Sequence, residues 1–108
     1  MKVLIDNCLP VDLRHELTGH QVETATYRGW AAKENGDLVN ACIEAGFDVI
    51  LSIDQGHDFA KAVEGKAIAA VLLPGSQGSR LADVLPFVDK ILEAILIARR
   101  GAITLVKP

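Results

Sequence analysis

Three short runs of apolar residues are the feature of this chain that most constrains its fold. Val3–Ile5, Val49–Ile53 and Ala67–Leu73 are of strand length and contain almost no polar side chain. Continuous apolar runs of this kind are typical of strands covered on both faces, as in a parallel sheet with helices on either side. Because 50% of the residues are hydrophobic and only 5% are aromatic, we expect a core of Val, Ile, Leu and Ala. The sequence therefore predicts the α/β class.

Strand-like and helix-like segments alternate along the whole chain. The predicted strands are Lys2–Asp6, Gln21–Ala25, Phe47–Ile53, Ala67–Leu73 and Ala102–Val106. The first predicted helix begins at Pro10 and stops before Gly19. Two further helices are predicted over Asp37–Ala45 and His57–Val63. The main helix is predicted from Pro86 to about Arg99, after a turn at Ser79. Thr26–Gly36 is predicted to be an irregular loop. We expect residues 1–108 to form one domain, a three-layer α/β/α fold around a mainly parallel sheet of about five strands.

Charge and cysteine content narrow the classes of function. Fourteen acidic and eleven basic side chains give a formal net charge of −3, which argues against binding nucleic acid through bulk positive charge alone. The two cysteines show no zinc-binding spacing, and we interpret them as reduced thiols of a cytoplasmic protein. No signal peptide is visible, and no apolar run approaches the about 20 residues that span a bilayer. We therefore expect no membrane-embedded segment.

Three acids are placed where they could share a site. Asp6 ends the first apolar run, Asp54 follows the third predicted strand, and Asp37 opens the helix between them. In an open parallel sheet the functional edge lies at the carboxyl ends of the strands, so these acids are expected to converge there. Two carboxylates about 4 Å apart repel by about 4 kcal/mol at an effective dielectric constant near 20, so the cluster requires a cation or a proton. The pattern predicts a Mg²⁺ or Mn²⁺ site.

A carboxylate-bound divalent cation can activate water against a phosphodiester bond, so the predicted reaction is metal-dependent phosphodiester hydrolysis. Asp6 and Asp54 are the predicted direct ligands, Asp37 is a ligand or the base that orients water, and Asp58 or Glu34 could complete a second metal position. The candidate phosphate-binding residues are Arg80, Ser76 and Lys33.

Each of these acids also has a purely structural interpretation. Asp6 could cap the following turn, and Asp37 could be favoured by the helix dipole without any function. A loop position in solvent suffices to explain Asp58, and a lone histidine such as His57 is usually a surface side chain. Trp30 could stack on a base but is better explained as the anchor of the long loop.

The chain resembles the short single-domain PIN-like proteins. The resemblance rests on four segments in register, which are Val3–Pro10, Gly19–Val22, Gly29–Leu38 and Phe47–Asp54. It implies a PIN-like fold and a Mg²⁺- or Mn²⁺-dependent ribonuclease, often the toxin partner of a small antitoxin protein. Carried over by position, the family's acids fall on Asp6, Asp37 and Asp54. The chain departs from the family's spacing of acids after Asp54, because Gln55–His57 lie between Asp54 and Asp58.

Two other functions fit the same skeleton. A receiver-like signalling domain would accept phosphate on Asp54 and bind Mg²⁺ through Asp6, with Ser76 after the fourth strand and Lys107 after the fifth. Receivers carry a pair of acids at the position where this chain has Asp6 and Asn7. They also carry a final helix after the lysine. A catalytically degenerate PIN-like module would bind a partner without cleavage. The apolar stripe of the helix that follows Pro86 could also pair two copies as a homodimer.

Overall fold

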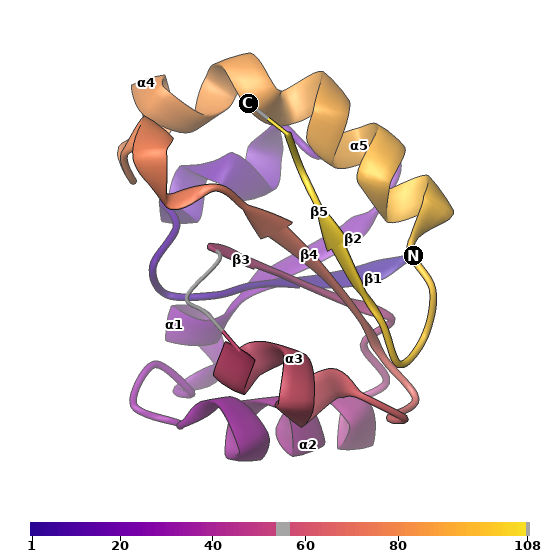
Figure 1. Ribbon diagram of the computed structural model, residues 1–108. Helices are drawn as coiled ribbons and strands as arrows, with labels where there is room; N and C mark the ends of the chain where they lie inside the picture. The colour runs from indigo at the N-terminus through magenta and orange to yellow at the C-terminus, as the bar shows by residue number, and fades with distance from the viewer. Residues whose placement is uncertain (54–56, 108) are drawn as a thin grey trace.

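Five short strands form one sheet in which every neighbouring pair is parallel (Figure 1). The strands are β1 (Lys2–Ile5), β2 (Gln21–Thr24), β3 (Val49–Ile53), β4 (Ala69–Leu73) and β5 (Ile103–Leu105), and their order in the sheet is β2-β1-β3-β4-β5. This computed structural model describes residues 1–53 and 57–107, with His57 and Asp58 described by their backbone alone. The predicted α/β class, with a parallel sheet of five strands, is confirmed.

Helical segments cover both faces of the sheet (Figure 1). They are η1 (Val11–His15), α1 (Ala25–Arg28), α2 (Asn35–Glu44), α3 (His57–Val63), η2 (Gly75–Gln77), α4 (Leu81–Val84), η3 (Leu85–Phe87) and α5 (Val88–Ile97), where η denotes a 3₁₀ helix. One face packs against α1, α2 and α3, and the other against η1, α4 and α5. The two covered faces give the three-layer architecture.

The alternation of side chains along each strand divides the core into two clusters. In β1, Val3 and Ile5 join the cluster between the sheet and α5, whereas Leu4 joins the cluster between the sheet and α2. All five residues of β4 are buried, as expected for a strand with a helical layer on each side. Burial on both faces is the reason that the strands appear in the sequence as unbroken apolar runs.

Several segments differ from their sequence-based predictions. The helix predicted from Pro86 begins at Val88 instead, after the short α4 and η3. The segment after Pro10 forms a 3₁₀ turn with i to i+3 hydrogen bonds, not an α-helix. The predicted loop after β2 begins with a helical turn, α1, because the Thr24 hydroxyl accepts a hydrogen bond from the Tyr27 N–H and Gly29 ends the turn with φ of 75°. In contrast, the predicted bounds of α3 are correct.

The strand order creates a topological switch point between β1 and β3. The chain moves from β1 outward to β2 and then crosses back to β3 on the other side of β1. Both strands run toward the same side of the sheet, on the left in Figure 1. In doubly wound folds with this order, ligands bind at the carboxyl ends of the strands at the switch point. The residues that follow β1 and β3 are therefore the candidates for a functional site.

No helix in the described part of the chain is both long enough and apolar enough to cross a membrane.

Candidate functional site

Asp6 is the first residue after β1, and its carboxylate is held in a fixed position. Its backbone N–H donates to the Leu51 carbonyl at 2.9 Å, which ties it to β3. Oδ1 accepts a hydrogen bond of 2.8 Å from the Asn7 N–H, and Oδ2 accepts one of 2.8 Å from the Ser52 hydroxyl. Each carboxylate oxygen has more than one acceptor position, so both can still bind a further donor or a cation. We call this region the β1/β3 junction, meaning residues 6–8 together with Ser52 and Ile53.

Ser52 is fully buried within β3, and sequence reasoning did not identify it as a site residue. Its hydroxyl proton goes to Asp6, and its oxygen lies 3.4 Å from Cys8 Sγ, so the Cys8 thiol is the donor of that contact. Burial, the strongest influence, raises the pKa of Cys8, and the negative charge of Asp6 raises it further. The thiol is therefore protonated at neutral pH. The sequence feature that could have identified Ser52 is its hydroxyl side chain inside an otherwise apolar strand.

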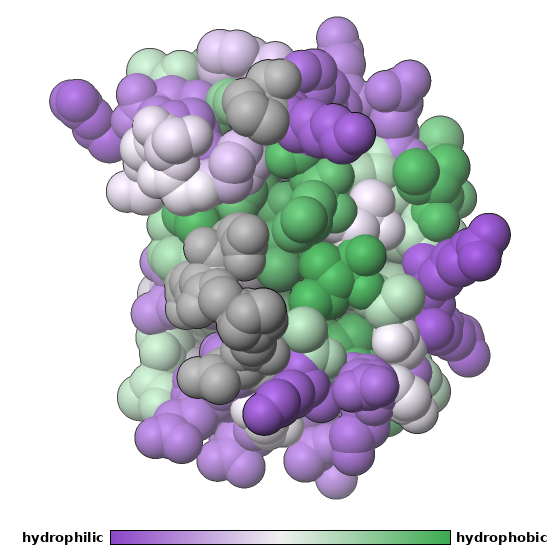
Figure 2. Space-filling view, in the orientation of Figure 1, coloured by the Kyte–Doolittle hydropathy of each residue, from purple (hydrophilic) through white to green (hydrophobic). Residues whose placement is uncertain are grey.

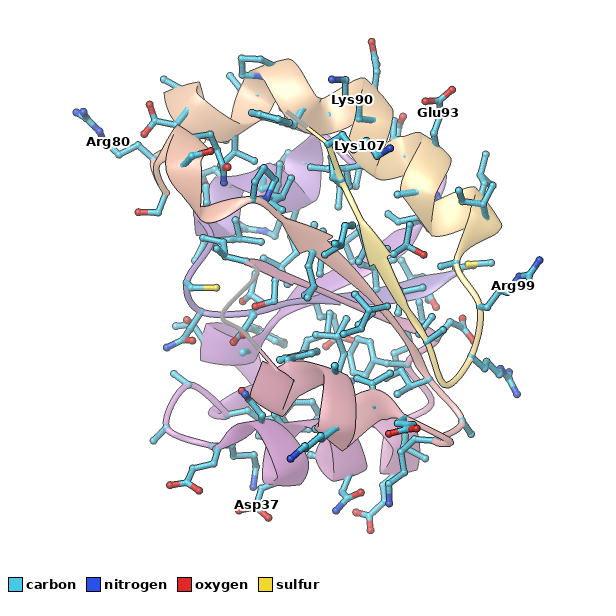
Figure 3. All side chains as sticks on the ribbon, in the orientation of Figure 1. Asp37, Arg80, Lys90, Glu93, Arg99 and Lys107 are labelled. Atoms are coloured by element: carbon cyan, nitrogen blue, oxygen red, sulfur yellow. The ribbon has the colours of Figure 1, made fainter. Side chains whose placement is uncertain are left out.

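Asp37 lies apart from this junction. It is exposed in the first turn of α2, and Figure 3 shows its side chain pointing away from the sheet. The inner face of α2 is formed by Leu38, Val39 and Cys42. Burial, and after it the negative charge of Asp6, raises the pKa of Cys42 to about 12. Each residue turns a helix by about 100°, and the outward position of Asp37 follows from its buried neighbours.

The other two predicted ligands lie outside the described residues. Asp54 follows the last residue of β3 in the sequence, and the side chain of Asp58 belongs to the undescribed part of α3. Among the side chains that the structure describes, in residues 1–53 and 59–107, no three of His, Cys, Asp or Glu form a group that could hold a metal ion. The metal site and its ligand set stay a prediction.

The residues proposed to bind phosphate are all exposed. Ser76 lies in η2 just beyond β4. Arg80 has a side chain that is 90% exposed, lies 3.7 Å from Asp83 and points outward in Figure 3. Lys33 lies in the loop before α2, and this loop is tied to the junction because the Asn7 side chain donates to the Ala31 carbonyl at 3.1 Å. The loop therefore brings Lys33 closer in the fold to Asp6 than their separation in sequence suggests.

Trp30 and Glu34 serve the loop that precedes α2. The Trp30 ring packs edge-on against Phe47 at 6.1 Å between ring centres and joins the core under α2, which confirms its interpretation as the loop anchor. Glu34 is the exposed residue at the start of α2, and it lines a hollow of about 690 Å³ together with Lys61 and Gly36.

A second hollow, of about 590 Å³, lies along edge strand β2. Sequence reasoning did not predict it. The residues that line it come from η1, β2 and α1, and they are Val11, Arg14, Val22, Glu23, Thr24, Thr26 and Tyr27. We call it the β2-edge hollow.

The acid of this hollow, Glu23, is already paired. Arg28 donates hydrogen bonds of 2.8 and 2.9 Å to its two carboxylate oxygens. This pairing lowers the pKa of Glu23 and raises that of Arg28.

Comparison with known proteins adds nothing to this geometry, because no family model, curated protein or solved structure matches the chain.

Proposed function

We propose that this protein is a divalent-metal-dependent ribonuclease of the PIN-like type, with its site at the β1/β3 junction. The observation that carries the proposal is the Asp6 carboxylate, oriented by Ser52 and Asn7 at the switch point of the sheet. The sequence places a second acid, Asp54, directly after the neighbouring strand. A preoriented carboxylate at this position is what a hard cation requires as a ligand.

In the proposed mechanism, Asp6 and Asp54 hold Mg²⁺ or Mn²⁺, which would supply a polarised water and neutralise charge on the phosphodiester. Ser52 fixes the orientation of the Asp6 carboxylate through its 2.8 Å hydrogen bond. The Cys8 thiol, whose pKa is raised chiefly by burial, lies 3.4 Å from the Ser52 hydroxyl oxygen and supports it. Asp58, Asp37 and Glu34 are the proposed additional acids, and Arg80, Ser76 and Lys33 are the proposed contacts to the RNA backbone.

The test is cleavage of a labelled single-stranded RNA with Mg²⁺ or Mn²⁺, and with EDTA as the control. We expect Asp6→Asn and Asp54→Asn to abolish cleavage, and Ser52→Ala to reduce it about 10- to 100-fold, as is typical when the partner of a metal ligand is removed. Asp89→Asn is the matched control, because Asp89 is exposed in the first turn of α5, on the other side of the sheet from α2. The effect of Asp37→Asn decides whether this outward-facing acid takes part.

Metal binding is measured separately by thermal unfolding. A cation that binds only the native state stabilises it by about 2.7 kcal/mol at 100 times its dissociation constant, so the melting temperature should rise with Mn²⁺ for the wild type and not for Asp6→Asn. A wild-type protein that neither cleaves RNA nor gains stability from Mg²⁺ or Mn²⁺ would contradict the proposal. RNA binding without cleavage would instead favour the degenerate PIN-like module.

A receiver-like phosphoacceptor is the second candidate, and the strand order favours it specifically. The order β2-β1-β3-β4-β5 is that of flavodoxin-like doubly wound domains, which include receivers. In Figure 3, however, Lys107 extends over α5 and not toward the carboxyl ends of β1 and β3. Incubation with a small phosphodonor separates the two functions, since a receiver would gain the mass of one phosphoryl group, lost in Asp54→Asn, and a nuclease would not.

The proposed setting is a cytoplasmic toxin controlled by a small antitoxin protein. Induced expression of the wild type is then expected to stop growth of host cells, whereas expression of Asp6→Asn is not. Normal growth on expression of a wild type that is active on RNA in vitro would contradict the toxin role while leaving the ribonuclease intact.

A further inference from the structure

The β2-edge hollow lies beside the β1/β3 junction. Thr24, which lines the hollow, is the register partner of Ile5, the residue before Asp6. Neighbouring strands are about 4.8 Å apart, so the carboxyl end of β2 adjoins the segment that carries Asp6. The hollow therefore lies at the same end of the sheet as Asp6.

Tyr27 forms one wall of the hollow, and its side chain is 82% exposed. Its backbone is nevertheless fixed, because the Tyr27 N–H donates to the Thr24 hydroxyl at 3.1 Å and Gly29 closes the turn. The structure thus presents an aromatic ring to solvent on a short rigid turn, beside an apolar floor that includes Val22. Exposed aromatic rings held in this way are the platforms on which nucleic-acid bases stack.

Arg14 lines the same hollow from η1 and supplies a positive charge. Its Nη1 donates to the Val11 carbonyl at 3.1 Å and lies 3.9 Å from Asp12, and its side chain is 37% exposed. A guanidinium group has five N–H donors, so most of them remain available for a phosphate. Arg28 offsets the negative charge of Glu23, so this carboxylate does not oppose a phosphate bound at Arg14.

We propose that the β2-edge hollow binds one nucleotide of single-stranded RNA, with the base on Tyr27 and a phosphate on Arg14. The inference deepens the proposed ribonuclease function and rests on it, since it assigns substrate binding to the strand end next to the one that carries Asp6. Aromatic stacking with a neighbouring cation is a sequence-tolerant way to hold single strands. The hollow therefore positions substrate, whereas Asp6 belongs to the chemistry.

The experiment uses Tyr27 as its own reporter, because it is the only tyrosine of the chain. Its ring resonances are followed by NMR while a short single-stranded oligouridylate is added in EDTA, so that binding is measured without metal-dependent cleavage. We expect the ring resonances to shift and saturate. Tyr27→Ala should weaken binding about 5- to 150-fold, the usual effect of losing one base stack, whereas Tyr27→Phe should bind like the wild type.

Arg14→Ala should weaken binding and also reduce its dependence on salt, which is the signature of a lost phosphate contact. Lys90→Ala is the matched control, because Lys90 is an exposed cation on α5. In the cleavage assay, Tyr27→Ala and Arg14→Ala should raise KM. Because Tyr27 is 82% exposed, the melting temperature should not change for Tyr27→Ala.

Failure of this inference can be distinguished from failure of the ribonuclease proposal. If Tyr27→Ala binds and cleaves RNA like the wild type while Asp6→Asn is inactive, the hollow is not the RNA subsite and the ribonuclease proposal stands. If the Tyr27 ring responds to oligouridylate but no metal supports cleavage, the hollow is a nucleotide site and the ribonuclease proposal fails. A ring that responds to no RNA overturns the inference and leaves the hollow to another class of ligand.

Discussion

At the scale of single residues, the chemistry of the junction depends on one buried hydroxyl. Ser52 is 0% exposed, and a buried hydroxyl without a partner would destabilise the fold by about 1–3 kcal/mol. The Asp6 carboxylate accepts the hydrogen bond that this hydroxyl donates, and the same bond fixes the orientation of the carboxylate at the end of β1. The same hydrogen bond therefore serves the stability of the core and the geometry of the proposed site.

Glu23 shows how a pair of side chains makes stability depend on pH. Arg28 lowers the pKa of Glu23 in the folded protein, so the pair stabilises the fold above the unfolded-state pKa, and this contribution is lost as the pH falls through the folded-state value. We expect the wild type to melt at a higher temperature than Glu23→Gln at pH 6, and the difference to shrink as the pH falls below the ordinary glutamate pKa of about 4.5.

The measurement for this pair is the melting temperature across that pH range, with Glu93→Gln as control. Glu93 is exposed and points into solvent in Figure 3. A difference between wild type and Glu23→Gln that stays constant down to pH 3 would show that the pairing contributes nothing to the acid-induced loss of stability.

At the scale of elements, the ends of the helices depend on particular backbone positions. Asp83 caps α4, since its Oδ2 accepts the Arg80 N–H at 3.2 Å. Gly78 precedes this helix with φ of 89°, and a Cβ atom there would lie 2.6 Å from the same Asp83 oxygen. The sequence indicated a turn in this region, but only the fold shows that a Cβ atom at position 78 would collide with the capping oxygen of Asp83.

We therefore expect Gly78→Ala to lower the free energy of unfolding by about 1–3 kcal/mol, through both the left-handed backbone and the displaced cap. Gly36→Ala is the matched variant, because Gly36 lies in α2 with no atom within 4 Å of its added Cβ. That variant should raise the free energy of unfolding by about 0.4–1 kcal/mol. Urea denaturation measures both, and equal effects of the two substitutions would contradict this account.

At the scale of the whole molecule, the sheet leaves β5 at an edge beside exposed apolar side chains. Leu96 and Ile97 of α5 are 70% and 68% exposed, and Leu105 of β5 is 57% exposed. Figure 2 shows hydrophobic surface over β5 and near the C-terminal end of α5. Apolar surface next to an unpaired strand edge is typical of an interface between chains.

If this surface pairs two copies as a homodimer, the mass in solution should rise from 11.6 kDa toward twice that value as concentration increases. A variant with Leu96→Lys and Ile97→Lys should stay at the monomer mass, because the charges would be buried in the interface. Sedimentation measures the mass, with Leu85→Lys, exposed in η3, as control. A wild type that stays monomeric at all concentrations would exclude the homodimer.

The sequence by itself determined the fold class and most element positions. A strand buried on both faces requires an apolar run, so β1, β3 and β4 were visible in the residues that form them, and the local pattern of α3 gave its bounds correctly. The position of Asp6 at the end of a strand is local information of the same kind.

Only the tertiary structure decided which residues meet. The contact of Ser52 with Asp6 joins positions 46 residues apart, and the β2-edge hollow is built from three separate elements. Asp37 faces outward because α2 docks through Leu38, Val39 and Cys42, a choice that depends on the sheet beneath it. Periodicity describes one element at a time, whereas a site is set by the packing of several elements on one another, and that packing follows from the order of the strands.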